Sequence, residues 1–425
     1  MFFNNIQAMR GIASLIVFIV HLFSTRPGMI PLWLEKGWYA IGPAGVDIFF
    51  VISGFVVTLA AAKAANSSDV RGSALTFMIK RLFRIYPAYW IVFAAATLLL
   101  PYVWLSPDWL PKASTFSLLT LTYTYNYKVM VAWTLVYEMF FYLVLSMLVL
   151  AGGRKFWGAL FIWIFVEIIA ISATNTYDWT LMGYVPLNPQ ILQFSAGCIV
   201  AFICTKFQTR FGKEMLIAGA VMFIVMCYVN INLGNWDPRY RTLTLTLPAA
   251  MMIYGAVVSE REGRFAFWKP VLFLGNISFS LYLWHQITFQ SLLAIFETHG
   301  LIDDLPHSMT LAIWAICGLA VGYASYVCIE KPSVRFVNGL FNGGKDGKNI
   351  VEVMPEVNMI NLYKDQAVSN LTARELALIC VMRDATAITP EQVAECYYRN
   401  LKLISNAPNF QNSHEEFEDE LVRPC

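Results

Sequence analysis

Long apolar segments recur along the first 340 residues, and they constrain the fold more than any other feature of the chain. A helix that crosses a bilayer needs ~20 apolar residues. Because backbone polar groups find no water in lipid, such segments form helices with internal hydrogen bonds. We therefore predict an all-α polytopic membrane protein with about ten transmembrane helices. The predicted spans are 10–23, 43–62, 85–104, 132–151, 156–173, 188–205, 214–232, 242–258, 270–296 and 308–329. The apolar segment 117–127 is too short to span, and we expect it to lie at the interface or to fold back.

Composition supports this class and excludes others. Hydrophobic residues make up 58% of the 425 residues and charged residues 14%, whereas soluble domains average about 25% charged residues. A soluble enzyme and a disordered chain are therefore excluded. The net charge of +2 gives no reason to expect a nucleic-acid partner. The eight cysteines form no C-x-x-C pair, so we expect neither a metal site nor a disulfide framework.

Basic residues in the loops predict the orientation of the chain. With the N-terminus inside, thirteen Lys and Arg residues fall in inner loops and six in outer loops. Because cytoplasmic loops are enriched in Lys and Arg, we expect both termini in the cytoplasm.

The C-terminal part differs in charge. From residue 345 onward there are 8 basic and 13 acidic residues. Capping-box patterns, Thr-x-x-Glu at 372–375 and Thr-x-x-Gln at 389–392, predict two short helices. We therefore predict a membrane domain over residues 1–340. A linker over 341–370, a short helical cytoplasmic module over 371–410 and an acidic flexible end over 411–425 follow it.

Arg10 and His21 lie in the first predicted span. They are eleven residues apart, which on a helix is three turns plus ~20° and a rise of ~16 Å. An inner cation and a deep imidazole therefore share one helix face. An ionisable side chain in hydrocarbon indicates function by default. The alternative is that Arg10 only follows the positive-inside rule and His21 is a hydrogen-bonded packing residue.

Two carboxylates accompany them. Asp47 lies in the second predicted span, and Glu138 lies ~10 Å deep in the fourth at ~1.5 Å per residue. A carboxylate beside an imidazole fixes its tautomer and raises its basicity, so we expect Glu138 or Asp47 to orient His21. The alternatives are a helix-start acid for Asp47 and a structural ion pair for Glu138.

Four further residues are candidate substrate contacts. Tyr142 lies one turn after Glu138, and Ser53 lies near mid-membrane; either is a candidate oxyanion donor. His285 lies in the outer half of the ninth span, as a substrate contact or a hydrogen-bonding anchor, and Trp133 opens the fourth span. We assign no role to Glu167.

A basic cluster precedes the third predicted span. Arg81 and Arg84 are three residues apart and share a helix face, with Lys80 beside them. Arginine suits bidentate phosphate contacts. The alternative is a basic surface helix that meets anionic lipid.

Six short motifs follow one another along the first 332 residues. They are Arg-x10-His at 10–21, GVDIFFVISGF at 45–55, Arg-x-x-Arg at 81–84 before IYPAYW, WTLVYE at 133–138, SLYLWH at 280–285 and IEKP at 329–332. On these motifs residues 1–340 resemble the membrane-bound acyltransferase-3 family. The tail after residue 340 is not part of the resemblance.

The resemblance implies ten core spans and transfer of an acyl group, usually acetyl, from cytosolic acyl-coenzyme A. The implied acceptor is a hydroxyl of a cell-envelope or exported glycan, and the implied location is the bacterial inner membrane. Carried over by position, His21 is the critical histidine with Arg10 as its motif partner. Arg81 and Arg84 are the inner arginine pair, and Glu138 is the motif glutamate. A fused hydrolase-like domain, present in some relatives, is not expected.

The residues fit this chemistry. Arg81, Arg84, Arg10 and Lys80 offer cations to the coenzyme A phosphates at the cytoplasmic mouth, and His21 is a candidate general base. A covalent acyl-histidine step is the mechanistic alternative. We expect acyl-CoA, a carbohydrate acceptor and the lipid bilayer as partners, and a homo-oligomer is left open. The rival classes are a proton-coupled transporter or flippase, and a non-catalytic assembly subunit.

Overall fold

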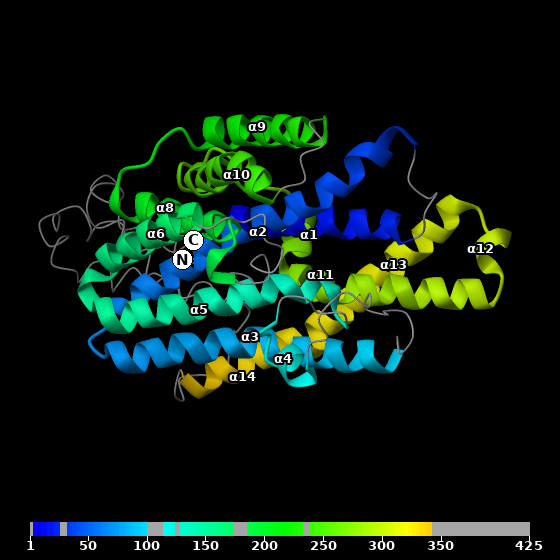
Figure 1. Ribbon diagram of the computed structural model, residues 1–425, viewed down its shortest axis with the longest axis horizontal. Coiled ribbons are helices and arrows are strands. Elements are labelled where there is room, and N and C mark those ends of the chain that lie inside the picture. The colour runs from blue at the N-terminus through cyan, green and yellow to red at the C-terminus, as the bar shows by residue number, and fades with distance from the viewer. Residues whose placement is uncertain are drawn as a thin grey trace, which may run out of the picture. The chain divides into compact units, whose positions relative to one another are not determined.

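The computed structural model describes residues 3–25, 32–99, 114–123, 128–173, 185–232 and 238–341. Within these ranges every regular element is helical (Figure 1). Seven of the described helical stretches are long and apolar enough to cross a membrane. The prediction of an all-α polytopic membrane protein is therefore confirmed. The predicted linker, helical module and acidic end lie outside the described residues, apart from residue 341.

Each predicted span overlaps a described helix, and residues 100–104 of the third span lie outside the described residues. The main helices are α1 (Asn4–Ser24), α2 (Leu32–Ala65), α3 (Val70–Leu99), α5 (Trp133–Gly152), α6 (Phe156–Ala173), α8 (Ile191–Lys206), α9 (Gly212–Asn232), α10 (Pro238–Arg261), α11 (Lys269–Thr298) and α13 (His307–Ser325). Between and after them lie α4 (Thr115–Leu119), α12 (Leu301–Asp304), a π-helical turn (Tyr326–Glu330) and α14 (Lys331–Phe341). One of the seven membrane-length stretches, Met130–Ala173, contains both α5 and α6.

The third helix begins earlier than the hydropathy predicted. It runs without a break from Val70 to Leu99, with Pro87 inside it, so the basic cluster belongs to the same helix as the apolar segment after it. Of the segment 117–127 the structure describes residues 117–123. There the short helix α4 ends against α3, where the Tyr89 hydroxyl donates to the Leu118 carbonyl at 2.6 Å. The carbonyls that a helix end leaves free are thus satisfied by α3.

Glycines let two helix pairs approach closely. At Gly275 on α11 an added Cβ would lie 2.0 Å from the Gln7 carbonyl oxygen of α1. At Gly54 on α2 it would lie 2.0 Å from the Phe194 carbonyl oxygen of α8. Small residues at such contacts allow backbones to meet in a membrane protein. These contacts fix α1 against α11 and α2 against α8.

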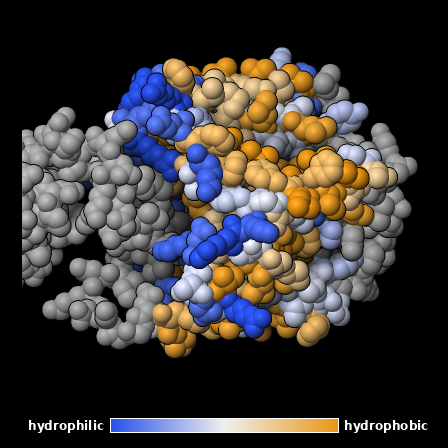
Figure 2. Space-filling view, turned by 90° about the vertical axis from the view of Figure 1, so that its left-hand side faces the viewer, coloured by the Kyte–Doolittle hydropathy of each residue, from blue (hydrophilic) through white to orange (hydrophobic). Residues whose placement is uncertain are grey.

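The surface fits a lipid environment. Many large apolar side chains of the described helices are exposed, among them Ile162 and Phe165 on α6 and Ile224 on α9. Figure 2 faces the end of the bundle from which α3 begins, where hydrophilic side chains gather in clusters between hydrophobic areas.

Candidate functional site

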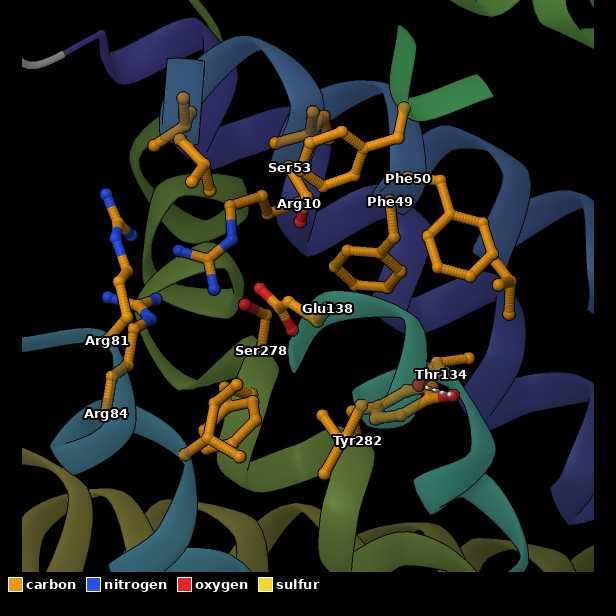
Figure 3. A pocket seen from close by; sticks show the side chains of 18 residues that line it. Arg10, Phe49, Phe50, Ser53, Arg81, Arg84, Thr134, Glu138, Ser278 and Tyr282 are labelled. Atoms are coloured by element: carbon orange, nitrogen blue, oxygen red, sulfur yellow. Dashed lines mark hydrogen bonds between the residues drawn. The ribbon is translucent and has the colours of Figure 1, made fainter. Parts of the chain in front are cut away.

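A pocket of about 860 Å³, including its mouth, opens among the helices (Figure 3). It is lined by side chains of α1, α2, α3, α5, α8 and α11. Five of the predicted site residues line it, and they come from four helices. These are Arg10, Ser53, Arg81, Arg84 and Glu138.

One end of the pocket is cationic. Arg10, Arg81 and Arg84 gather there (Figure 3). The Arg81 guanidinium lies over the rings of Phe77 and Tyr142, with 5.6 Å to each centroid. Such stacking holds a guanidinium plane in place while its edge stays free to bind an anion. Three arginines therefore give this end of the pocket a positive charge, the kind of environment that suits anionic groups such as phosphates.

The other end of the pocket is apolar. Phe49, Phe50, Leu135 and Tyr282 line it, together with the hydroxyl of Thr134. The Phe49 and Tyr282 rings meet edge to face with centroids 5.9 Å apart. The Tyr282 hydroxyl donates to the Val131 carbonyl at 3.1 Å, which fixes this ring at the pocket's end. A neutral, narrow group fits this end.

Glu138 lies beside Arg10 rather than beside His21. Its Oε1 accepts a hydrogen bond of 2.5 Å from the Tyr142 hydroxyl. In Figure 3 its carboxylate lies close to Arg10 at the centre of the pocket. The expected contact with His21 is not found among the described residues, since the Glu138 carboxylate bonds to Tyr142 and the His21 ring bonds to His285.

His21 meets His285 instead of a carboxylate. Nδ1 of His21 and Nε2 of His285 are 2.9 Å apart. His285 is fully buried, with its ring packed against those of Phe18, Phe289 and Tyr282. Neither His21 nor His285 lines the pocket, although Tyr282, three residues before His285, does. The two histidines therefore lie just beyond the apolar end of the pocket.

Asp47 faces away from the pocket. Its carboxylate accepts a hydrogen bond of 2.8 Å from Gln193 of α8 and pairs with Arg241 of α10 at 3.2 Å. The reason is helical periodicity: Val46, Phe49 and Ser53 face the pocket, whereas Asp47 and Gly54 share the face that packs on α8. The structure thus gives Asp47 a partner other than His21.

The remaining predicted residues lie outside the pocket lining. The Lys80 ammonium lies over the ring of Phe341 on α14, at 5.9 Å from the centroid. Trp133 packs edge to face against Phe50 and Tyr137. Tyr142 is fully buried behind Glu138 and reaches the pocket through its hydrogen bond to that carboxylate.

Sequence reasoning missed two residues near Arg10. Ser278 lines the pocket, and its buried Oγ has no hydrogen-bond partner among the described residues. Glu330, in the π-helical turn, accepts a 2.7 Å hydrogen bond from Ser280 and is an electrostatic neighbour of Arg10. Signals for both existed. Ser278 and His285 are seven residues apart and so share a helix face, and Glu330 is part of the IEKP motif.

Comparison with known proteins identifies the family. Residues 3–330 match the family described as "Acyltransferase domain". The chain is 27% identical over 321 residues to the exopolysaccharide production protein ExoZ of Rhizobium meliloti (strain 1021), covering 70% of this chain and 91% of that protein. It is 25% identical over 360 residues to the putative membrane-bound transacylase BcsY of Komagataeibacter xylinus, covering 79% and 84%.

A third relative is longer than this chain. A putative O-acetyltransferase of Staphylococcus aureus (strain COL) is 25% identical over 297 residues, covering 61% of this chain and 48% of that protein. No solved structure matches the chain. The family match covers residues 3–330, and the described helices include seven of membrane-spanning length. The chain therefore belongs to the membrane-bound acyltransferase-3 family.

Proposed function

We propose that the protein transfers an acyl group, acetyl in the simplest case, from cytosolic acyl-coenzyme A to a hydroxyl of an exported or cell-envelope polysaccharide. The names of the relatives support this, since one is an exopolysaccharide production protein and another a putative O-acetyltransferase. The observation that carries the proposal is the pocket, with three arginines at one end and an apolar end beside two histidines.

The cationic and apolar ends of the pocket match the charged and uncharged ends of the donor. Coenzyme A carries its charge on phosphates at one end and its thioester at the end of a long, thin, uncharged arm. Arg10, Arg81 and Arg84 bind the phosphates, and the apolar end receives the arm. Arg10 and His21 are ~16 Å apart along α1, which is of the order of the arm's reach. The thioester approaches His21 past the rings of Phe49 and Tyr282.

His21 is the general base in this proposal. It takes the proton of the acceptor hydroxyl while that oxygen attacks the thioester carbonyl. The carbon–sulfur bond then breaks, and His21 returns the proton to the departing sulfur. The Tyr142 hydroxyl is already bonded to Glu138, and Ser53 and Ser278 lie near Arg10 rather than beside His21 (Figure 3), so none of the three is assigned as the donor to the oxyanion. With both termini in the cytoplasm, the cationic mouth faces the donor's compartment.

Mass analysis of the polysaccharide tests the reaction. Cells with the wild-type protein should yield glycan heavier by one acyl group at each modified sugar, and cells with His21→Ala should not. His299→Ala is the matched control, because His299 is exposed and bonds only to its own helix. An unmodified glycan in wild-type cells, with glycan export lost on deletion, would instead favour the transporter.

The donor site has its own test. Arg81→Gln with Arg84→Gln should raise the KM for acetyl-CoA at least tenfold, because charge-assisted hydrogen bonds contribute about 1.5–3 kcal/mol each. Arg264→Gln is the control, since Arg264 pairs with Glu214 outside the pocket. An unaltered KM in the double variant would remove the arginines from the donor site.

A further inference from the structure

Two imidazoles in direct contact inside the membrane domain lie outside the lining of the pocket. His21 on α1 and His285 on α11 are 264 positions apart in the chain, yet their ring nitrogens are 2.9 Å apart. The close contact of α1 and α11 at Gly275 holds the two helices together. At this distance one ring nitrogen donates a hydrogen and the other accepts it, and the other contacts of each ring determine which is which.

The contact of the other ring nitrogen of His285, Nδ1, determines which nitrogen of this ring carries the hydrogen. Nδ1 of His285 lies 3.0 Å from the Leu281 carbonyl oxygen. A carbonyl only accepts, so Nδ1 carries the hydrogen and donates it. In the neutral ring Nε2 is then an acceptor, and the Nδ1 of His21 that faces it must donate.

With the hydrogen on Nδ1, Nε2 of His21 keeps its lone pair. No hydrogen bond reaches this nitrogen from the residues that the structure describes.

We propose that His285 is the positioning residue of His21: it accepts the Nδ1 hydrogen, holds His21 in the Nδ1–H tautomer and leaves Nε2 as the basic nitrogen. His285 thereby does with a neutral imidazole what a carboxylate does in a catalytic triad. When Nε2 of His21 takes the hydroxyl proton, Nδ1–H stays bonded to His285, which stabilises the imidazolium. The proton leaves again from Nε2 to the sulfur. This inference rests on the proposed role of His21 as base.

Two substitutions of His285, by side chains of similar length, distinguish the loss of the hydrogen-bond acceptor from the loss of packing. Glutamine in His285→Gln places a carbonyl oxygen near the site of Nε2, whereas methionine in His285→Met fills the same space without a strong acceptor. We expect His285→Met to lower kcat by about 10²-fold or more and His285→Gln to recover a large part of it. The KM for acetyl-CoA should not change in either, because His285 does not line the donor pocket.

A spectroscopic measurement reads the tautomer directly. In ¹⁵N-histidine-labelled wild-type protein, with His21→Ala to assign the signal, Nδ1 of His21 should be protonated and Nε2 should not. A protonated Nε2 in the neutral wild-type ring would overturn the proposal, even if His285→Met failed to fold.

The kinetic outcomes distinguish two failures. If His21→Ala retains activity, the proposed function of His21 fails. If His21→Ala is inactive and His285→Met is as active as His285→Gln, the role of His285 alone fails.

Discussion

At Gly275 the backbone of α11 touches that of α1, and an alanine there should disturb both parts of the site. Its Cβ would lie 2.0 Å from the Gln7 carbonyl oxygen, and real Cβ atoms essentially never come within 3.0 Å. The helices must therefore separate by about 1 Å. If the separation extends along both helices, the distance of 2.9 Å between His21 and His285 rises toward about 4 Å, which breaks the hydrogen bond.

Two measurements follow from that displacement. A misplacement of about 1 Å near a catalytic group costs about 10²-fold in rate, and overpacking costs about 1–3 kcal/mol of folding free energy. We expect both losses for Gly275→Ala, measured as acetyl transfer by purified protein in lipid nanodiscs and as unfolding in denaturant. Gly11→Ala should be milder, because its nearest contacts are 2.7 Å away.

Gly158→Ala on α6 is the matched control. Nothing lies within 4 Å of its added Cβ, so the same chemical change should leave rate and stability unaltered or slightly raised. The reasoning is refuted if Gly275→Ala is as active and as stable as Gly158→Ala.

Three further substitutions test separate parts of the site. Asp47→Ala leaves Arg241 without its carboxylate and should lower the free energy of unfolding by about 3 kcal/mol, with the KM for acetyl-CoA unchanged. A loss of kcat without a loss of stability would instead indicate that Asp47 takes part in the reaction. Tyr142→Phe removes the hydrogen bond to Glu138 and should lower kcat/KM about tenfold to a hundredfold, and a wild-type value would mean that this hydrogen bond does not orient the carboxylate. Lys80→Ala should leave the KM for acetyl-CoA at its wild-type value, since Lys80 does not line the pocket; a rise of tenfold would place it in the donor site.

Relations within one helix were predictable from the sequence. Hydropathy located the helices because it reflects a property of each segment alone. The spacing of Arg81 and Arg84 predicted that the two side chains share a helix face, and both line the pocket. The same periodicity also separates Asp47 from Ser53, which lies on the pocket face of α2.

Relations between helices were not predictable in this way. The partner of His21 lies 264 residues away, and its contact depends on how α1 packs against α11. Glu138 bonds to Tyr142 of its own helix and lies close to Arg10 of α1, and the latter neighbour depends on how α5 packs against α1. Glu330 reaches Ser280 through a π-helical turn that hydropathy does not detect.

Among the described residues the neighbour of His21 is an imidazole rather than the expected carboxylate, and the apolar medium gives a physical reason for this. A carboxylate that orients a base is charged, and burying a charge in a membrane domain costs several kcal/mol unless a cation neutralises it. Asp47, which is fully buried, has such a cation in Arg241. A cation placed beside His21 as well would weaken its ability to take a proton. Neutral His285 accepts the Nδ1 hydrogen without bringing either charge, so it orients the base at a lower desolvation cost.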